Sequence, residues 1–155
     1  MHWRDQAALC LATGFSVGRA PFAPGTFGSL LALPLCAGLA LLGPGIAAVG
    51  AAAFLVPAIW AAGRAEALLG RRDAPAIVVD EIAGMLIALA GLPFNVFNAA
   101  AGFAVFRVMD ILKPFPAGRI DSRMRGGVGI VMDDVVAGVY ANLILRLAVV
   151  LVPAA

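Results

Sequence analysis

The chain has 155 residues, which is enough for one compact domain with a single core. Hydrophobic residues make up 63% of it and charged residues 13%, whereas soluble domains have roughly 45–50% apolar and about 25% charged residues. This composition indicates a membrane protein, and a net charge of +2 gives no support for binding to nucleic acid. We therefore expect a single membrane-embedded domain over residues 1–155.

The first long apolar tract predicts a tight helical hairpin. Residues 27–63 include no charged side chain, and the sequence GPG at 43–45, near the middle, is a strong turn signal. Each half has about 16–18 residues, at the short end of the roughly 17–25 that cross the hydrocarbon. Pro34 and Pro57 then lie inside the two spans, where neighbouring helices make interior prolines tolerable.

A second apolar tract, 82–106, is interrupted by the sequence GLPFN at 91–95. If this tract were one straight helix, Asp80 and Asp110 would lie about 45 Å apart, on opposite faces of the membrane. If the chain instead reverses at 91–95, both acids share one face and each half is too short to span the membrane. We favour this second interpretation, a re-entrant or partly buried helix pair whose irregular backbone is covered by protein.

The basic residues favour the reversal as well. With it, all but one of them fall on one side of the membrane, and the positive-inside tendency makes that side cytoplasmic. These residues are Arg4, Arg19, Arg64, Arg71, Arg72, Arg107, Lys113, Arg119, Arg123 and Arg125. The exception, Arg146, lies in the apolar tract 135–155, which predicts a C-terminal transmembrane helix. The sequence thus predicts an all-α, polytopic membrane bundle made of a hairpin, a short helix pair and a final span.

Acidic residues form three clusters at the boundaries of apolar segments: Asp80–Glu81, Asp110 and Asp133–Asp134. Capping of helix N-termini is one explanation, and it suits Asp133–Asp134 best and Asp110 least. If the chain folds as expected, however, the five carboxylates gather on one face and indicate a site for a divalent cation. Hard oxygen ligands suit Mg²⁺ best, which commonly binds to one or two carboxylates, water and a substrate phosphate.

Basic and glycine-rich segments near these acids would complement a metal–phosphate site. Arg107, Asp110 and Lys113 follow one another at steps of three residues, so a helix would place them roughly on one face. There the two cations can hold a phosphate beside a metal ligand. The turn at 19–29, RAPFAPGTFGS, opens an apolar helix whose N-terminus is either a simple cap or an anion site with Thr26 as a donor. Any phosphate cleavage would be metal-assisted, because the sequence lacks the usual settings of cysteine, histidine or aspartate nucleophiles.

Four segments together resemble the phosphatidylglycerophosphatase A family, in that family's order: GRAPFAPGTFGSLLALPL, VVDEIAGMLIAL, FRVMDILKPFPAGRID and GGVGIVMDDVVAGVYANL. The resemblance spans residues 18–143. It implies a Mg²⁺-dependent lipid phosphatase of the bacterial inner membrane with its active site facing the cytoplasm. Its reaction would convert phosphatidylglycerol phosphate, a phospholipid substrate, into phosphatidylglycerol and inorganic phosphate.

The resemblance also implies which residues are essential, and we infer their roles from charge and position. The expected catalytic residues are Asp80, Glu81, Asp110 and Asp134. The expected metal ligands are Asp80, Asp110, Asp133 and Asp134. The expected phosphate-binding residues are Arg107, Lys113, Thr26 and Arg19. Glu81, or whichever acid is free of metal, would take the proton from the attacking water.

A small ion-coupled transporter or channel subunit is the alternative from another functional class. Acids beside a broken helix are typical of such proteins. Against it, the chain is short, has no internal repeat and keeps its acids at segment boundaries. The sequence leaves the oligomeric state open.

Overall fold

The computed structural model describes residues 2–151, and this range is helical apart from turns and loops. In chain order the elements are α1 (Trp3–Ala12), the 3₁₀ turn η1 (Val17–Arg19), α2 (Pro24–Leu41), α3 (Pro44–Leu69), α4 (Val79–Leu89), α5 (Val96–Leu112), α6 (Ala117–Arg123) and α7 (Gly126–Leu151). The prediction of an all-α protein is confirmed.

Three helices, α2, α3 and α7, are long and apolar enough to cross a membrane. The first two form the predicted N-terminal hairpin, and Pro34 and Pro57 lie inside them as expected. The third is the predicted C-terminal span, but it begins at Gly126, nine residues before the expected start at Val135. Residues 152–155, which the prediction included in this span, lie outside the described residues.

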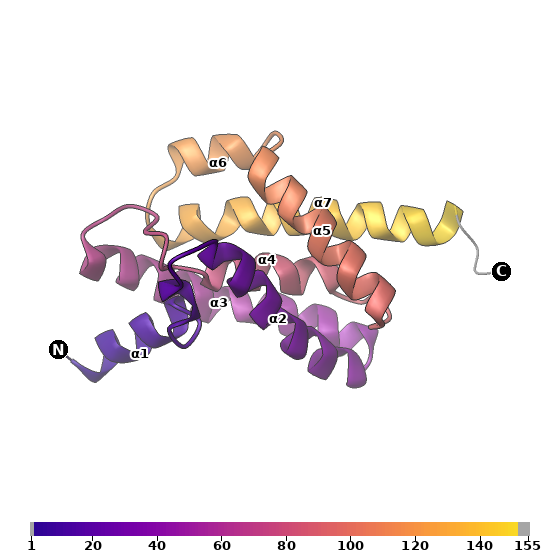
Figure 1. Ribbon diagram of the computed structural model, residues 1–155, viewed down its shortest axis with the longest axis horizontal. Helices are drawn as coiled ribbons and strands as arrows, with labels where there is room; N and C mark the ends of the chain where they lie inside the picture. The colour runs from indigo at the N-terminus through magenta and orange to yellow at the C-terminus, as the bar shows by residue number, and fades with distance from the viewer. Residues whose placement is uncertain (1, 152–155) are drawn as a thin grey trace.

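The middle tract does not form one straight helix. The first half, α4, ends at Leu89, and α5 begins at Val96 after a loop, where the Asn95 side chain accepts a hydrogen bond of 2.8 Å from the backbone amide of Asn98. The two helices run in opposite directions, so the start of α4 and the end of α5 lie toward the same end of the molecule (Figure 1). The predicted reversal is therefore present, and it keeps Asp80 and Asp110 on one side.

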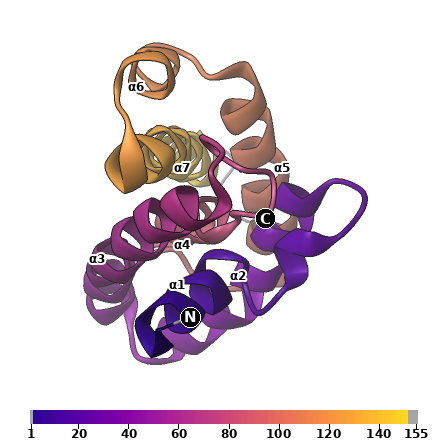
Figure 2. The same ribbon diagram turned by 90° about the vertical axis from the view of Figure 1, so that its left-hand side faces the viewer.

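The helix α4 occupies the middle of the bundle. In the end-on view of Figure 2 it is surrounded by α2, α3, α5 and α7, and nine of its 11 residues are buried. Small residues bring it into direct backbone contact with α7: a Cβ atom added to Gly138 would lie 2.3 Å from the carbonyl oxygen of Gly84. This close packing places the first turn of α4 beside the third turn of α7.

The two ends of the bundle differ in chemistry. The end at which α2, α4 and α7 begin, on the left of Figure 1, carries the acids and the basic loops. The opposite end exposes large apolar side chains on the hairpin turn and on the start of α5: Leu41, Ile46, Val96 and Phe97. Arg146 is the one charged residue in the described part of α7 beyond Asp134, toward that apolar end.

Candidate metal and phosphate site

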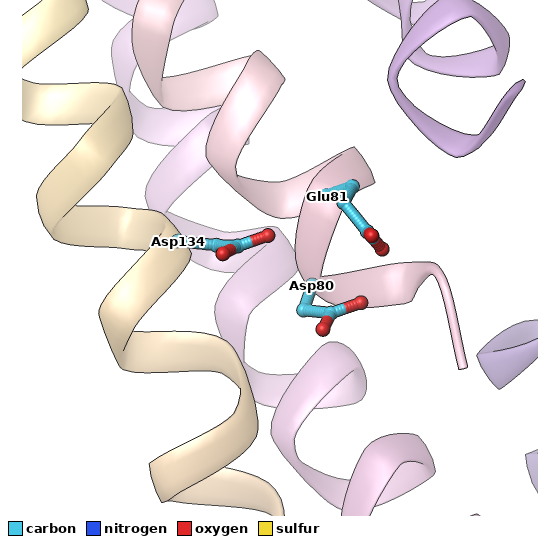
Figure 3. Close-up of side chains that lie close together, drawn as sticks. All are labelled: Asp80, Glu81 and Asp134. Carbon is cyan, nitrogen blue, oxygen red and sulfur yellow. The ribbon is translucent and has the colours of Figure 1, made fainter. Parts of the chain in front are cut away.

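Three carboxylates from two helices meet at the charged end of the bundle. Asp80 and Glu81 stand in the first turn of α4, and Asp134 projects toward them from the neighbouring α7 (Figure 3). One oxygen from each lies within 4.8 Å of the other two. Because Asp134 is far in sequence from Asp80 and Glu81, only the packing of α4 on α7 creates this triad.

The position of Asp134 excludes helix capping, the alternative explanation that suited Asp133 and Asp134 best. The helix α7 starts at Gly126, so Asp133 and Asp134 lie in its third turn and not at its N-terminus. Asp80 and Glu81 do stand in the first turn of α4, where the positive end of the helix dipole favours them.

Burial makes the triad costly without a positive partner. Asp80 is 7% exposed and Asp134 is 3% exposed. Asp80 Oδ1, Glu81 Oε2 and Asp134 Oδ2 are all buried and accept no hydrogen bond from the described protein. Isolated buried carboxylates are strongly disfavoured, and an oxygen-lined group of this kind fits a hard divalent cation.

The electrostatics of α4 agree with this fit. Burial raises the pKa of Asp80 well above its usual range, and the charges of Glu81 and Asp134 raise it further. Burial also raises the pKa of Glu81, with the charge of Asp110 adding to the rise. A bound cation would offset both burial and the repulsion between like charges, because it stabilises the charged carboxylates.

Arg107 and Asp110 lie beside the triad on α5. The Nη1 atom of Arg107 is 2.7 Å from Asp110 Oδ2 and 3.9 Å from Glu81 Oε1. This nitrogen is buried, yet its contacts do not meet hydrogen-bond geometry, so it keeps a donor for an incoming anion. The predicted grouping of Arg107 with the acids is therefore present in the structure.

The N-terminus of α2 closes another side of the same site. A Cβ atom added to Gly25 would lie 2.0 Å from Glu81 Oε1 and 3.3 Å from Arg107 Nη1. Thr26, the next residue, is half-buried in the same first turn. The turn at 19–29 thus contacts the acids at Gly25, where Glu81 lies too close for any side chain.

Other predicted residues take different positions. Asp133 accepts a hydrogen bond from Lys113 and stays outside the triad. Burial lowers the pKa of Lys113, but the hydrogen bond to Asp133 and the charges of the nearby carboxylates together raise this pKa above its usual value. Arg19 is exposed and borders a surface hollow together with Arg71, rather than the acids.

Asp121 is a further acid next to the site. Its Oδ1 atom lies 3.4 Å from Lys113 Nζ, so this lysine has carboxylates on two sides. The short helix α6, which carries Asp121, falls in the polar tract 107–134, where no helical periodicity marks it.

The fold and the site define a class of protein: a small helical membrane protein with buried carboxylates, an arginine and a lysine gathered at one end of the bundle. The family model for phosphatidylglycerophosphatase A matches residues 10–149, and the chain belongs to that family. It is a lipid phosphatase of phospholipid metabolism, which sets aside the transporter alternative.

Curated relatives agree with this membership. The chain is 38% identical over 136 residues to phosphatidylglycerophosphatase A of Escherichia coli (strain K12), covering 87% of this chain and 79% of that protein. It is 39% identical over 137 residues to the protein of the same name from Haemophilus influenzae, covering 87% of this chain and 84% of the relative. A Bacteroides thetaiotaomicron protein with the provisional name phosphatidylinositol-3-phosphatase is 40% identical over 148 residues, covering 90% of this chain and 92% of the relative. No solved structure matches the chain.

Proposed function

We propose that this protein hydrolyses phosphatidylglycerol phosphate to phosphatidylglycerol and inorganic phosphate, with Mg²⁺ as its cofactor. The observation that carries the proposal is the triad of Asp80, Glu81 and Asp134. One oxygen of each lies within 4.8 Å of the other two, and each residue has a buried oxygen without a hydrogen-bond partner. The names of two relatives support the choice of substrate.

The three triad carboxylates are the groups that would hold the metal. When bound, Mg²⁺ polarises the phosphoryl oxygens and lowers the pKa of a coordinated water. Asp133, which the sequence suggested as a further ligand, instead neutralises Lys113 and orients it. Asp110 lies next to the triad without belonging to it. We propose that it acts as the general base, which takes the proton from the attacking water.

The basic groups around the triad suit a phosphate monoester. Arg107 offers its free donor beside Glu81, and the first turn of α2 brings the backbone of Gly25, including its amide, to the same carboxylate. Donors of this kind stabilise the charge that develops on the phosphoryl oxygens. Asp110 holds Arg107 in place through their 2.7 Å contact.

The membrane arrangement brings a lipid head group to this site. The charged end of the bundle would face the cytoplasm, following the positive-inside tendency, and the apolar end would lie in the lipid of the bacterial inner membrane. The head group then reaches the acids while the acyl chains stay in the hydrocarbon. We also propose that the α4–α5 pair is re-entrant, because its loop and the start of α5 expose apolar side chains, among them Phe94, Val96 and Phe97, and no charge.

The deciding experiment measures release of inorganic phosphate by the purified protein in detergent. We expect release from phosphatidylglycerol phosphate with Mg²⁺, loss of it with a chelator, and recovery with excess Mg²⁺. Leu143→Ala, on an exposed part of α7 away from the acids, serves as an active control. Absence of release would refute the proposed reaction.

A second substrate belongs in the same assay because of the name of the Bacteroides relative. Phosphatidylinositol 3-phosphate presents a phosphate monoester on a bulkier, ring-shaped head group. We expect it to be hydrolysed more slowly than phosphatidylglycerol phosphate. Faster hydrolysis would keep the metal-assisted phosphatase and overturn the proposed substrate.

A further inference from the structure

The carbonyl end of α4 is closed by a side chain of α7. The Nδ2 atom of Asn142 lies 3.2 Å from the carbonyl oxygen of Ile87, 3.0 Å from that of Ala88 and 3.0 Å from that of Ala90. The two N–H groups of this amide are therefore shared among three carbonyls. Two of them belong to the last turn of α4 and the third to its C-cap, Ala90, where carbonyls lack the regular i+4 partner; Ile87 also accepts a bond from the Ala90 amide.

Arg146 completes the same arrangement one turn further along α7. Its Nε atom donates a hydrogen bond of 2.7 Å to Asn142 Oδ1, and its Nη2 atom donates one of 3.0 Å to the carbonyl oxygen of Ala90. The guanidinium also packs on Gly91, where an added Cβ atom would lie 3.0 Å from Nη2. A cation at this position complements the negative end of the α4 dipole.

The surroundings of the end of α4 explain why side chains, and not water, donate hydrogen bonds to its carbonyls. The end of α4 lies beside the hairpin turn, since a Cβ atom on Gly91 would come within 3.5 Å of the carbonyl oxygen of Pro44. The hairpin turn and the start of α5 beside it expose apolar side chains, among them Val96 and Phe97. A helix that ends in such an environment has little water to satisfy its carbonyls, so the protein must supply the donors.

The contacts along α4 and α7 occur at three levels. Asp80 and Asp134 meet at the charged end, and the backbones touch at Gly84 and Gly138. The Asn142 contacts form the third level, about 12 Å beyond Asp134 along α7. A shift of α4 along α7 would break the hydrogen bonds of Asn142 and, at the same time, move Asp80 and Glu81 away from Asp134.

We propose that Asn142 and Arg146 are positioning residues that hold α4 in register on α7, and so set how Asp80 and Glu81 meet Asp134. Neither side chain touches the acids; both act through the α4 backbone. The role in holding the register of α4 is argued from the hydrogen bonds alone. The effect on metal binding rests on the proposed function.

The test uses the full-length protein in detergent and two readouts that need no turnover. Asn142→Asp keeps the shape of the side chain and removes its N–H donors, and Leu143→Ala is the matched control on the exposed face. We expect Asn142→Asp to speed backbone hydrogen exchange about tenfold or more along all of α4, including its acidic first turn. Mn²⁺ affinity, measured by electron paramagnetic resonance, should weaken about tenfold.

Arg146 provides a milder variant in case Asn142→Asp does not fold. Arg146→Met removes the cation and two hydrogen bonds, whereas Arg146→Lys keeps a charged donor for Ala90. We expect the methionine variant to loosen both ends of α4 and the lysine variant to stay close to the wild type. Unchanged exchange in the first turn of α4, in whichever of Asn142→Asp and Arg146→Met folds, would overturn the proposal.

The two proposals fail in different ways. If the wild type releases no phosphate but α4 loosens in Asn142→Asp, the positioning role stands and the proposed reaction is wrong. If phosphate release is normal and α4 keeps its protection in the variants, the reaction stands and the positioning role is wrong.

Discussion

Lys113 and Asp133 form an ion pair that joins the end of α5 to the third turn of α7. Asp133 is 5% exposed, and Lys113 follows the last residue of α5 with a left-handed backbone (φ 44°). The two acids of α7 therefore have different partners: Asp134 belongs to the triad, and its neighbour Asp133 pairs with a lysine.

This pair makes a prediction about stability. Lys113→Met leaves Asp133 buried without a partner and should lower the free energy of unfolding by about 1–2 kcal/mol, a value reduced because the lysine is partly exposed. Adding Asp133→Asn removes the buried charge, so the double variant should regain most of the lost free energy of unfolding. It should not regain phosphatase activity. Thermal unfolding and phosphate release of the single and double variants check this. Equal melting temperatures for both variants would show that the pair does not act as a unit.

The acids of the site should be needed for activity but not for folding. Asp80→Asn, Asp110→Asn and Asp134→Asn should each lower kcat about a hundredfold or more, a size typical of lost transition-state stabilisation. If all three variants keep near-wild-type kcat, these carboxylates have no part in the reaction.

Metal removal should reveal the repulsion within the triad. In a chelator, Asp134→Asn relieves a buried like-charge contact and should melt above the wild type, since about 1 kcal/mol shifts the melting temperature of such a chain by roughly 2–4 °C. With Mg²⁺ the order should reverse, because only the wild type gains stability from the bound ion. Melting curves with chelator and with Mg²⁺ provide the comparison. If Mg²⁺ leaves the melting temperature of the wild type unchanged, the triad is not a metal site.

Two glycines of α2 offer a matched pair of substitutions. Gly25→Ala places a Cβ atom 2.0 Å from Glu81 Oε1 and should lower kcat/KM more than about tenfold by displacing this carboxylate. Gly38→Ala adds the same atom where nothing lies within 4 Å, and it should leave activity unchanged. Phosphate release by the two variants is compared at equal folded concentration. Equal activity of both would mean that the close approach of α2 to Glu81 is not required.

The re-entrant arrangement predicts how the far end of the bundle reacts with labels. A cysteine at Val96, 87% exposed on the isolated chain, should react poorly with a membrane-impermeant maleimide added from the periplasm, because lipid covers it. A cysteine at Arg71 should react from the cytoplasm. The native Cys10 and Cys36 are replaced first. Rapid periplasmic labelling at Val96 would show that the loop crosses to the far face.

Much of the architecture could be predicted from the sequence because its signals are local. Hydropathy and the turn at 43–45 located the hairpin, and GLPFN at 91–95 located the reversal. The start of α7 could not be predicted, because RGGVG has the composition of a loop. A Cβ atom on Gly127 would lie 1.9 Å from the carbonyl oxygen of Ile59, so these glycines serve a close helix contact that composition alone does not reveal.

By itself, the sequence determined the class of the protein and the set of acids and bases from which a site is built. Only the tertiary structure decided which of them meet: Glu81 joins the triad, Asp133 turns to Lys113, and Arg146 closes the end of α4. The reason is geometric. Helical periodicity follows from neighbouring residues, whereas the rotation and register of α4 on α7 depend on contacts between residues some 50 positions apart, such as Gly84 with Gly138 and Ala90 with Asn142.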